Sequence, residues 1–219
     1  MSYFTFTGES KVVNNVVVHQ IVATEYIRGH GGIQRGTIGG YVQSVDNLSD
    51  NAWVADDAVI MGDAQATDGA LISGRVVVKD YSYISGGVKI TDLAVVEDYA
   101  RIIGAQGELV PESILICDDA TISGYARLST TYGGSISICN SAIVEKHATL
   151  TGGGIRMRDH AIATDNSVLS SVVTLSGESY IGGDVVLNSI HGVEVGGDTT
   201  LMGYQLITEK TSLHTADPF

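Results

Sequence analysis

The chain has 219 residues, of which 44% are apolar and 17% are charged, so it can bury a core and does not have the composition of a disordered chain. Its formal net charge of −13 argues against a broad nucleic-acid-binding face, and its 27 glycines follow no G-X-Y period, which excludes collagen. Its 2 cysteines are too few for a disulfide framework, and no apolar run is long enough to span a membrane.

The first 47 residues lack the repeat that follows, and we expect them to form a β cap. The stretches "YFTFTGES" and "KVVNNVVVHQIVAT" predict two strands joined near Gly8 and Glu9. The glycine-rich "GHGGIQRGTIGG" has neither the Gly-Lys-Ser/Thr ending of a phosphate-binding loop nor a helix after it, so we interpret it as turns of the cap. The N-terminus shows no basic-then-apolar signal, which favours a cytoplasmic location in a bacterial host cell.

From residue 48 the sequence repeats every six residues, as "NAWVADDAVIMGDAQATDGALIS" illustrates. Apolar residues occupy the first position of each hexad without a break from Leu48 to Ile102, and the fifth position is small or branched. Gly, Asp and Asn recur at the third and fourth positions, and these residues tolerate the backbone angles of a tight corner. Each hexad therefore predicts a short strand and a corner, and three hexads complete a triangular coil with a parallel sheet on each side.

The hexads resume after several interruptions and predict about eight coils over residues 48–213, followed by a C-terminal tail at 214–219. Threading the coils places the first-position residues in three inward columns. The interruptions all fall between the third column and the first, at residues 104–113, 129–135, 151–154 and 188–192. The loops should therefore emerge at one edge, where they either mark the functional face or merely preserve the stack.

The hexad pattern resembles that of the left-handed parallel β-helix, and the left hand is implied by this resemblance, since crossover connections in general favour the right hand. In addition, "FTGESK", "GTIGGYVQSVDNLS" and "NAWVADDAVIMGDA" resemble a widespread family of uncharacterised bacterial and phage or prophage proteins with an N-terminal strand cap. The matching residues are Gly39, Gly40, Tyr41, Asn47, Leu48, Ser49, Asn51, Ala52, Trp53 and Val54. The resemblance implies a phage or prophage origin and identifies no catalytic residue.

A row of ring side chains should stack on successive coils after the second column, beside a second row two residues further along each coil. The first row is Tyr81, Tyr99, Tyr125 and His147, and the second is Tyr83, Arg101 and Arg127. We call these seven residues the Tyr/Arg strip. Arg suits phosphate or carboxylate and rings suit bases or sugars, so the strip is the candidate site for a small anionic ligand or a host protein. The alternative is a ladder that only stabilises the coils, with Arg paired to nearby Asp; Arg156 and Arg158 form a second basic spot.

The residues just before the second column form an apolar ridge along the whole rod. They are Val59, Val77, Val95, Thr121, Ile143, Ile162, Tyr180 and Thr200. An outer apolar face needs cover, which predicts a homo-oligomer, and by analogy with this fold a homotrimer. Strand propensity of branched residues is the alternative explanation.

Hexapeptide-repeat acyltransferases resemble this chain in their prism and use a His base between subunits, which makes His30, His147, His160 and His191 the residues to weigh. His147 and His160 occupy outward corners, where a structural or solvent-exposed role is commoner, so we assign no catalytic residue. Zinc carbonic anhydrases of this fold need three converging His, which the spacing does not supply, and we expect no metal and no cofactor.

The two cysteines, Cys117 and Cys139, each follow an inward Ile on adjacent coils. Neighbours of this kind can approach disulfide distance. We expect two free thiols instead, because parallel in-register strands rarely give the right geometry and a cytosol would reduce the pair.

Together these observations predict a non-enzymatic, homo-oligomeric β-helix binding protein of phage or prophage type, with no membrane segment and no direct nucleic-acid binding. Its expected role is counter-defence, by inhibiting a host protein or sequestering a nucleotide-like anionic ligand. The alternatives are a hexapeptide-repeat acyltransferase, a structural phage component and an acidic DNA mimic.

Overall fold

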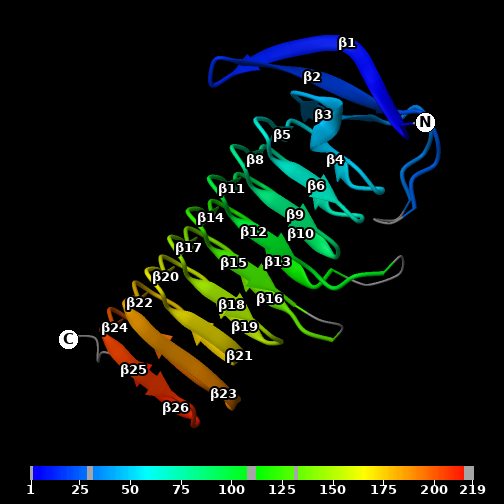
Figure 1. The fold of residues 1–219 in the computed structure, drawn as a ribbon. Coiled ribbons are helices and arrows are strands. Elements are labelled where there is room, and N and C mark those ends of the chain that lie inside the picture. Colours follow the sequence, from blue (N-terminus) through cyan, green and yellow to red (C-terminus); the bar gives the residue numbers. More distant parts are fainter. Residues whose placement is uncertain (1, 29–31, 108–111, 131–132, 215–219) are drawn as a thin grey trace.

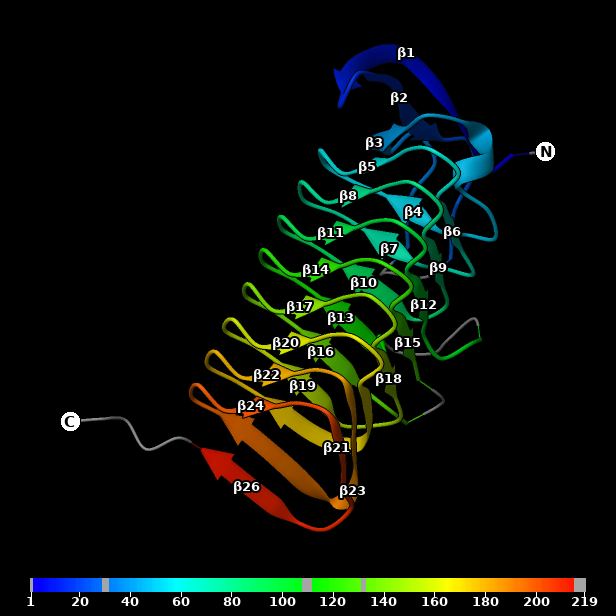
Figure 2. The same cartoon turned by 60° about the vertical axis from the view of Figure 1, so that its left-hand side comes forward.

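The computed structural model describes residues 2–28, 32–107, 112–130 and 133–214. Within these ranges, short strands stack in parallel on the sides of a rod, which confirms the predicted parallel β-helix (Figure 1, Figure 2). The one helix there is the 3-10 turn η1 (Val45–Asn47), and no described helix is long and apolar enough to cross a membrane.

Three faces make up the rod, each with one short strand per coil. The first face contains β4 (Trp53–Val54), β7 (Leu71–Ile72), β10 (Val88–Ile90), β13 (Ile114–Ile116), β16 (Ile136–Ile138), β19 (Ile155–Met157) and β26 (Thr211–His214). The second contains β5 (Val59–Ile60), β8 (Val77–Val78), β11 (Val95–Val96), β14 (Thr121–Ile122), β17 (Ile143–Val144), β20 (Ile162–Ala163), β22 (Tyr180–Ile181) and β24 (Thr200–Leu201). The third contains β6 (Gln65–Thr67), β9 (Tyr83–Ser85), β12 (Arg101–Ile103), β15 (Arg127–Ser129), β18 (Thr149–Thr151) and β25 (Tyr204–Ile207). Two long strands, β21 (Val168–Leu175) and β23 (Asp184–Gly196), run through the corner and join the third face to the first.

The strand registers confirm the predicted inward columns. The first column is Val54, Ile72, Ile90, Ile116, Ile138, Met157, Leu175, Val195 and Leu213. The second is Val42, Ile60, Val78, Val96, Ile122, Val144, Ala163, Ile181 and Leu201. The third is Leu48, Ala66, Ile84, Ile102, Leu128, Leu150, Leu169, Leu187 and Ile207.

The rod has about nine coils, one more than the hexads predicted. The extra coil begins before residue 48, in β3 (Ile38–Val42), where Val42 pairs in parallel with Ile60. At the other end, Leu213 of β26 pairs with Val195 and completes the first column. Apart from Ile207 and Leu213 at the open end, the column residues are buried, so each coil contributes branched side chains worth about 1.5–3 kcal/mol each to one continuous core.

Acidic residues hold the corners together. From the coil of Val54 to that of Leu201, each coil turns through one residue with positive φ after the first column and another after the second. They are Asp56, Gly74, Asp92, Asp118, Asn140, Asp159, Gly177 and Gly197, then Gly62, Asp80, Asp98, Gly124, Lys146, Asp165, Gly183 and Gly203. Several Asp carboxylates also accept the backbone N–H of the next coil, for example Asp56 from Gly74 and Asp98 from Gly124, both at 2.9 Å. Much of the negative charge therefore has a structural origin, because Asp both tolerates the left-handed angle and provides the acceptor.

The N-terminal hairpin differs from the prediction. The strands β1 (Phe4–Val13) and β2 (Val16–Ala23) are antiparallel and joined by Asn14 and Asn15, whose φ values of 50° and 64° make a tight two-residue turn. The predicted turn near Gly8 and Glu9 is wrong, because that stretch is a register irregularity inside β1. Glycine at positive φ bends the strand there without ending it.

The end of the cap fits closely on the first coils. A Cβ on Gly39 would lie 2.6 Å from the Val54 carbonyl oxygen, and one on Gly40 would lie 2.6 Å from the Ala58 carbonyl oxygen, so both positions require glycine. Asn47 is 2% exposed and its side-chain amide donates to the carbonyls of Gly62 and Ala64. These contacts explain why a Gly-Gly pair and an Asn stand where the cap meets the first coils.

Three of the four predicted insertions leave the rod between the third and first faces. They connect β12 to β13, β15 to β16 and β18 to β19, and Figure 1 shows the loops along one edge of the rod. The fourth, at 188–192, is not a loop, because these residues lie inside the continuous strand β23, whose register shifts against β21 there. Residues 108–111 and 131–132 of these loops lie outside the described residues. At the same edge, the side chains of Val172 and Ile190 are exposed.

Candidate functional site

The four ring side chains of the first row of the Tyr/Arg strip stack face to face. Ring centroids lie 4.9 Å apart for Tyr81 and Tyr99, 4.8 Å for Tyr99 and Tyr125, and 5.1 Å for Tyr125 and His147. The planes are within 4° to 5° of parallel. The predicted stacking on successive coils is therefore confirmed.

This stacking decides which surface of the rings a ligand can reach. The faces of Tyr99 and Tyr125 are covered by their neighbours, so a base cannot insert between them. The edges are open, because Tyr81, Tyr99 and Tyr125 are 56%, 49% and 50% exposed. The ladder therefore offers a row of ring edges, which are electrostatically positive, and of phenol hydroxyls that can donate hydrogen bonds.

The second row of the strip lies on the third face, in register from coil to coil. Arg101 pairs with Tyr83 on one side and with Arg127 on the other. The guanidinium of Arg101 lies 4.6 Å from the centroid of the Tyr83 ring, in a cation–π contact. Both Arg side chains are exposed. The structure thus brings all seven predicted residues onto two neighbouring columns.

The two Arg of the strip have no acidic partner within the described residues, although the protein is acidic. Four of the Lys residues do have such partners, and the ion pairs are Lys11–Asp57, Lys79–Asp80, Lys79–Glu97, Lys89–Glu112 and Lys146–Asp165. The alternative in which nearby Asp neutralises Arg101 and Arg127 therefore finds no support in the described contacts. Their positive charge faces solvent.

Two of these ion pairs border the strip and shift side-chain pKa values. A hydrogen bond from Lys79 to Glu97 raises the pKa of Lys79, against a smaller opposing effect of desolvation. Next to His147 in the sequence, Lys146 donates a hydrogen bond of 2.7 Å to Asp165, which raises the pKa of Lys146 and lowers that of Asp165. Lys79 and Lys146 both belong to the corner after the second column, where the first row of the strip lies.

The described histidines that were weighed as possible bases, His147, His160 and His191, lie on different parts of the rod. The His147 ring stacks on Tyr125, while His160 and His191 are exposed on other parts of the rod. Among the described histidines, no imidazole is hydrogen-bonded to a carboxylate that would orient it as a base. His30 lies outside the described residues.

The apolar ridge runs along the second face, and the cap covers its beginning. Val59 is 2% exposed and packs with Val18 of the hairpin and with Met61, while Val77 lies against the same cluster. The prediction that Val59 belongs to a subunit interface is therefore wrong, because the cap of the same chain already buries this side chain. Further along, the ridge is half-buried at Val95, Thr121, Ile143, Ile162 and Tyr180, and Thr200 is exposed.

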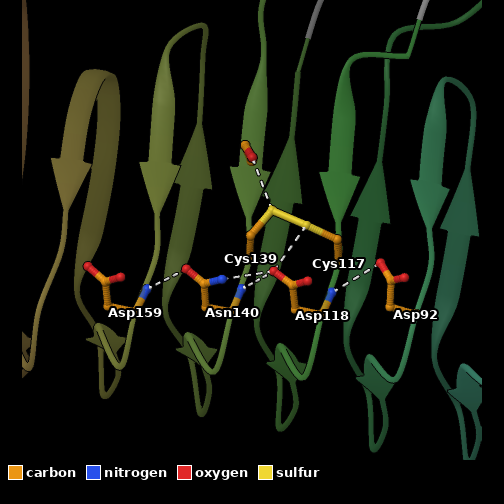
Figure 3. Close-up of a disulfide and its surroundings, with 7 residues drawn as sticks. Asp92, Cys117, Asp118, Cys139, Asn140 and Asp159 are labelled. Carbon is orange, nitrogen blue, oxygen red and sulfur yellow. Dashed lines mark hydrogen bonds between the residues drawn. A yellow bond between two sulfur atoms is a disulfide. The ribbon is translucent and has the colours of Figure 1, made fainter.

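The cysteines also differ from the prediction. Cys117 and Cys139 form a disulfide between adjacent coils, with Cα atoms 4.7 Å apart (Figure 3). The expectation of two free thiols is wrong, because the spacing of in-register strands falls inside the Cα–Cα range of 4.4–6.8 Å that disulfides span. The signal was present in the sequence, since both residues follow a first-column Ile in consecutive coils.

The disulfide borders an open groove at the corner after the first column. The groove has a volume of about 630 Å³. It is lined by Gly74, Arg75, Asp92, Leu93, Asp118, Asp119, Asn140 and Ser141. Sequence reasoning did not single out this groove, since its residues appear in the hexads only as ordinary corner residues. Figure 3 shows Asp92, Asp118, Asn140 and Asp159 in a row that crosses the two cysteine-bearing coils.

Comparisons with protein-family models and with curated protein sequences find no match for this chain.

Proposed function

We propose that this protein is a non-enzymatic, homo-oligomeric binding protein whose Tyr/Arg strip takes a small anionic ligand with a chain of phosphates, such as a nucleotide. The observation that carries the proposal is the pair Arg101 and Arg127, in register on adjacent coils and without a carboxylate partner among the described residues. In a chain of net charge −13, two adjacent unpaired guanidiniums are an unusual feature, and Arg binds phosphate bidentately.

The ring ladder is better suited to contact the phosphate groups of the ligand than its base. Because the inner faces of the ladder are filled, the rings meet a ligand with their edges and hydroxyls. Adjacent phosphates along the strip could accept hydrogen bonds from the Tyr hydroxyls and from both guanidiniums. A base could stack only at an end of the ladder, on the outer face of Tyr81 or of His147.

Oligomerisation through the apolar ridge completes the proposal. From Val95 to Tyr180 the half-buried side chains form one stripe on the second face, which is apolar except at Thr121. That face meets the strip at the corner after the second column, so a neighbouring subunit on the ridge would border the strip. A trimer is the arrangement that we propose by analogy with the fold.

The biological setting of the proposal rests on the resemblance of residues 3–64 to phage and prophage proteins. A phage protein that sequesters a host nucleotide signal would act against host defence without chemistry of its own. The corner carboxylates are less suited to DNA mimicry, because many of them accept hydrogen bonds from backbone N–H groups of the next coil.

The proposal is tested by calorimetric titration of the full chain with inorganic tripolyphosphate, ATP and adenosine. We expect tripolyphosphate and ATP to bind and adenosine not to bind. Since a charge-assisted hydrogen bond contributes about 1.5–3 kcal/mol, Arg101→Ala and Arg127→Ala should each weaken affinity about tenfold or more. Arg156→Ala, which removes an exposed Arg from the first face, is the matched control and should bind like wild type.

Two results would contradict the proposal. One is equal affinity of Arg101→Ala, Arg127→Ala and Arg156→Ala for the phosphate ligands, which would move the site elsewhere. The other is that neither tripolyphosphate nor ATP binds the correctly folded oligomer, as judged by circular dichroism and native mass spectrometry. In the second case, capture of an acidic host protein in an Arg101-dependent manner would identify the strip as a protein interface.

A further inference from the structure

Three potential metal ligands converge at the disulfide. The sulfur atoms of Cys117 and Cys139 and a carboxylate oxygen of Asp118 lie within 4.8 Å of one another. The Cys117 sulfur is 3.9 Å from Asp118 Oδ2, and the Ser137 hydroxyl is 3.5 Å from the Cys139 sulfur. Figure 3 shows both sulfurs and the Asp118 carboxylate on the same side of the two adjacent coils.

The coil geometry places these ligands at a spacing that a tetrahedral metal accepts. A tetrahedral Zn²⁺ with Zn–S bonds of about 2.3 Å holds its sulfurs about 3.8 Å apart. The two Cα atoms are 4.7 Å apart, so reduced side chains reach that separation by rotating about χ1, with the backbone unchanged. Asp118 follows Cys117 directly, and its Oδ2 accepts hydrogen bonds from the backbone N–H and the side-chain amide of Asn140 at 2.8 and 2.9 Å, which hold the carboxylate beside the sulfurs.

The groove gives the site access and a favourable charge. Asp92, Asp118 and Asp119 line it with three carboxylates against one cation, Arg75. A divalent cation can therefore enter from solvent and keep a water molecule as its fourth ligand. Two thiolates, one carboxylate and water form a ligand set typical of zinc.

We propose that reduction converts the Cys117–Cys139 disulfide into a Zn²⁺ site completed by Asp118. A dithiol reductant transfers two electrons and two protons to the disulfide and leaves as its own cyclic disulfide, so the S–S bond breaks and two thiols form. Zn²⁺ then displaces both thiol protons and binds two thiolates. Disulfide and metal exclude each other, since oxidation removes both thiolates and releases the ion.

The same coils are therefore joined in either redox state, by a covalent bond or by a metal. The site lies at the corner after the first column, whereas the Tyr/Arg strip lies at and beyond the corner after the second. The proposed zinc site is thus independent of the proposed anion-binding function.

The test uses Co²⁺ as a spectroscopic probe of the full chain. The protein is reduced with a phosphine, which brings no competing thiols, and is then desalted without oxygen. We expect reduced wild type to bind a single Co²⁺ per chain with a thiolate-to-metal charge-transfer band, and Zn²⁺ to displace it. The disulfide form should show no such band.

Variants separate the three ligands from the surrounding charge. Cys117→Ser and Cys139→Ser should each abolish the band, and Asp118→Asn should weaken Co²⁺ binding about tenfold or more. Asn is tolerated at this backbone angle, as Asn140 shows on the next coil, so Asp118→Asn should fold. Asp119→Asn removes an equal charge from the same groove and is the matched control with unchanged binding.

The proposal is overturned by any of three results. They are a reduced wild type without a thiolate-to-Co²⁺ band, a band that persists in either Cys variant, and a loss of binding in Asp119→Asn as large as that in Asp118→Asn. The last result would mean that the groove attracts cations by charge alone.

Discussion

The ring of Tyr99 stacks on that of Tyr125 with the centroids 4.8 Å apart, although an insertion lengthens this coil from 18 to 26 residues. The insertion between β12 and β13 lies at the corner between the third and first faces, so the extra residues do not disturb the ladder at the corner after the second column. Coil position, and not sequence distance, therefore decides which side chains meet.

The ladder should contribute to stability as well as to binding. Tyr99 stacks on both sides, and each aromatic pair is worth about 0.5–1.5 kcal/mol, so Tyr99→Ala should lower the free energy of unfolding by about 1–3 kcal/mol. Urea denaturation followed by circular dichroism measures this. Tyr204→Ala, at a position 87% exposed and outside the described ring pairs, should cost clearly less. Equal losses in the two variants would show that stacking adds nothing.

The corner carboxylates should be needed for both their angle and their oxygen. Asp56 has φ of 56° and accepts the Gly74 N–H at 2.9 Å. Asp56→Ala should therefore lower the free energy of unfolding by about 2 kcal/mol, from left-handed strain and the lost acceptor. Asp56→Asn keeps a side-chain oxygen and tolerates the angle, and should stay within about 0.5 kcal/mol of wild type. Thermal or urea unfolding of the two variants gives the comparison, and a loss as large for Asn as for Ala would refute the explanation.

The apolar ridge should hold the oligomer together. Ile143 lies half-buried near the middle of the ridge, so Ile143→Glu would place a charge in the proposed interface and should dissociate the oligomer into monomers. Sedimentation or native mass spectrometry measures the mass, and circular dichroism checks that the rod remains folded. Val172→Glu, at an exposed position on the loop edge, is the control and should leave the mass unchanged. A folded Ile143→Glu variant with the wild-type mass would place the interface elsewhere.

Tyr3 should make stability fall at alkaline pH. Its hydroxyl donates to the Ala52 carbonyl at 2.9 Å, and burial, with a smaller effect of Asp50, raises the pKa of Tyr3 well above its usual value. Above pH of about 10 the unfolded chain loses this proton while the folded chain keeps it, so the free energy of unfolding decreases as pH rises.

The variant Tyr3→Phe separates this effect from other titrations. At pH 8 the variant should be about 1 kcal/mol less stable, because the hydrogen bond to Ala52 is lost. The difference in free energy of unfolding between wild type and the variant should shrink between about pH 10 and 11, since only wild type carries the Tyr3 ionisation. Urea unfolding across this range tests the prediction. Tyr204→Phe should run parallel to wild type, and a constant gap for Tyr3→Phe would contradict the raised pKa.

The sequence predicted the strip because its residues obey the repeat. Once Ile84, Ile102 and Leu128 are assigned to one inward column, Tyr83, Arg101 and Arg127 must point outward next to each other. The hairpin turn could not be located in this way. In that segment no repeat restricts the choice, and Gly8 offered a turn signal as strong as that of Asn14 and Asn15.

By itself, the sequence determined the three faces, the inward columns and the single edge for the loops, because a period of six fixes which side chains share a face of a three-sided coil. The tertiary structure alone decided which outward residues are covered, paired or bonded. Val18 covers Val59, Cys117 bonds to Cys139, and Arg101 and Arg127 meet no described carboxylate. These outcomes depend on the path of the hairpin, the spacing between coils and the directions of side chains at the surface, none of which affects the repeat.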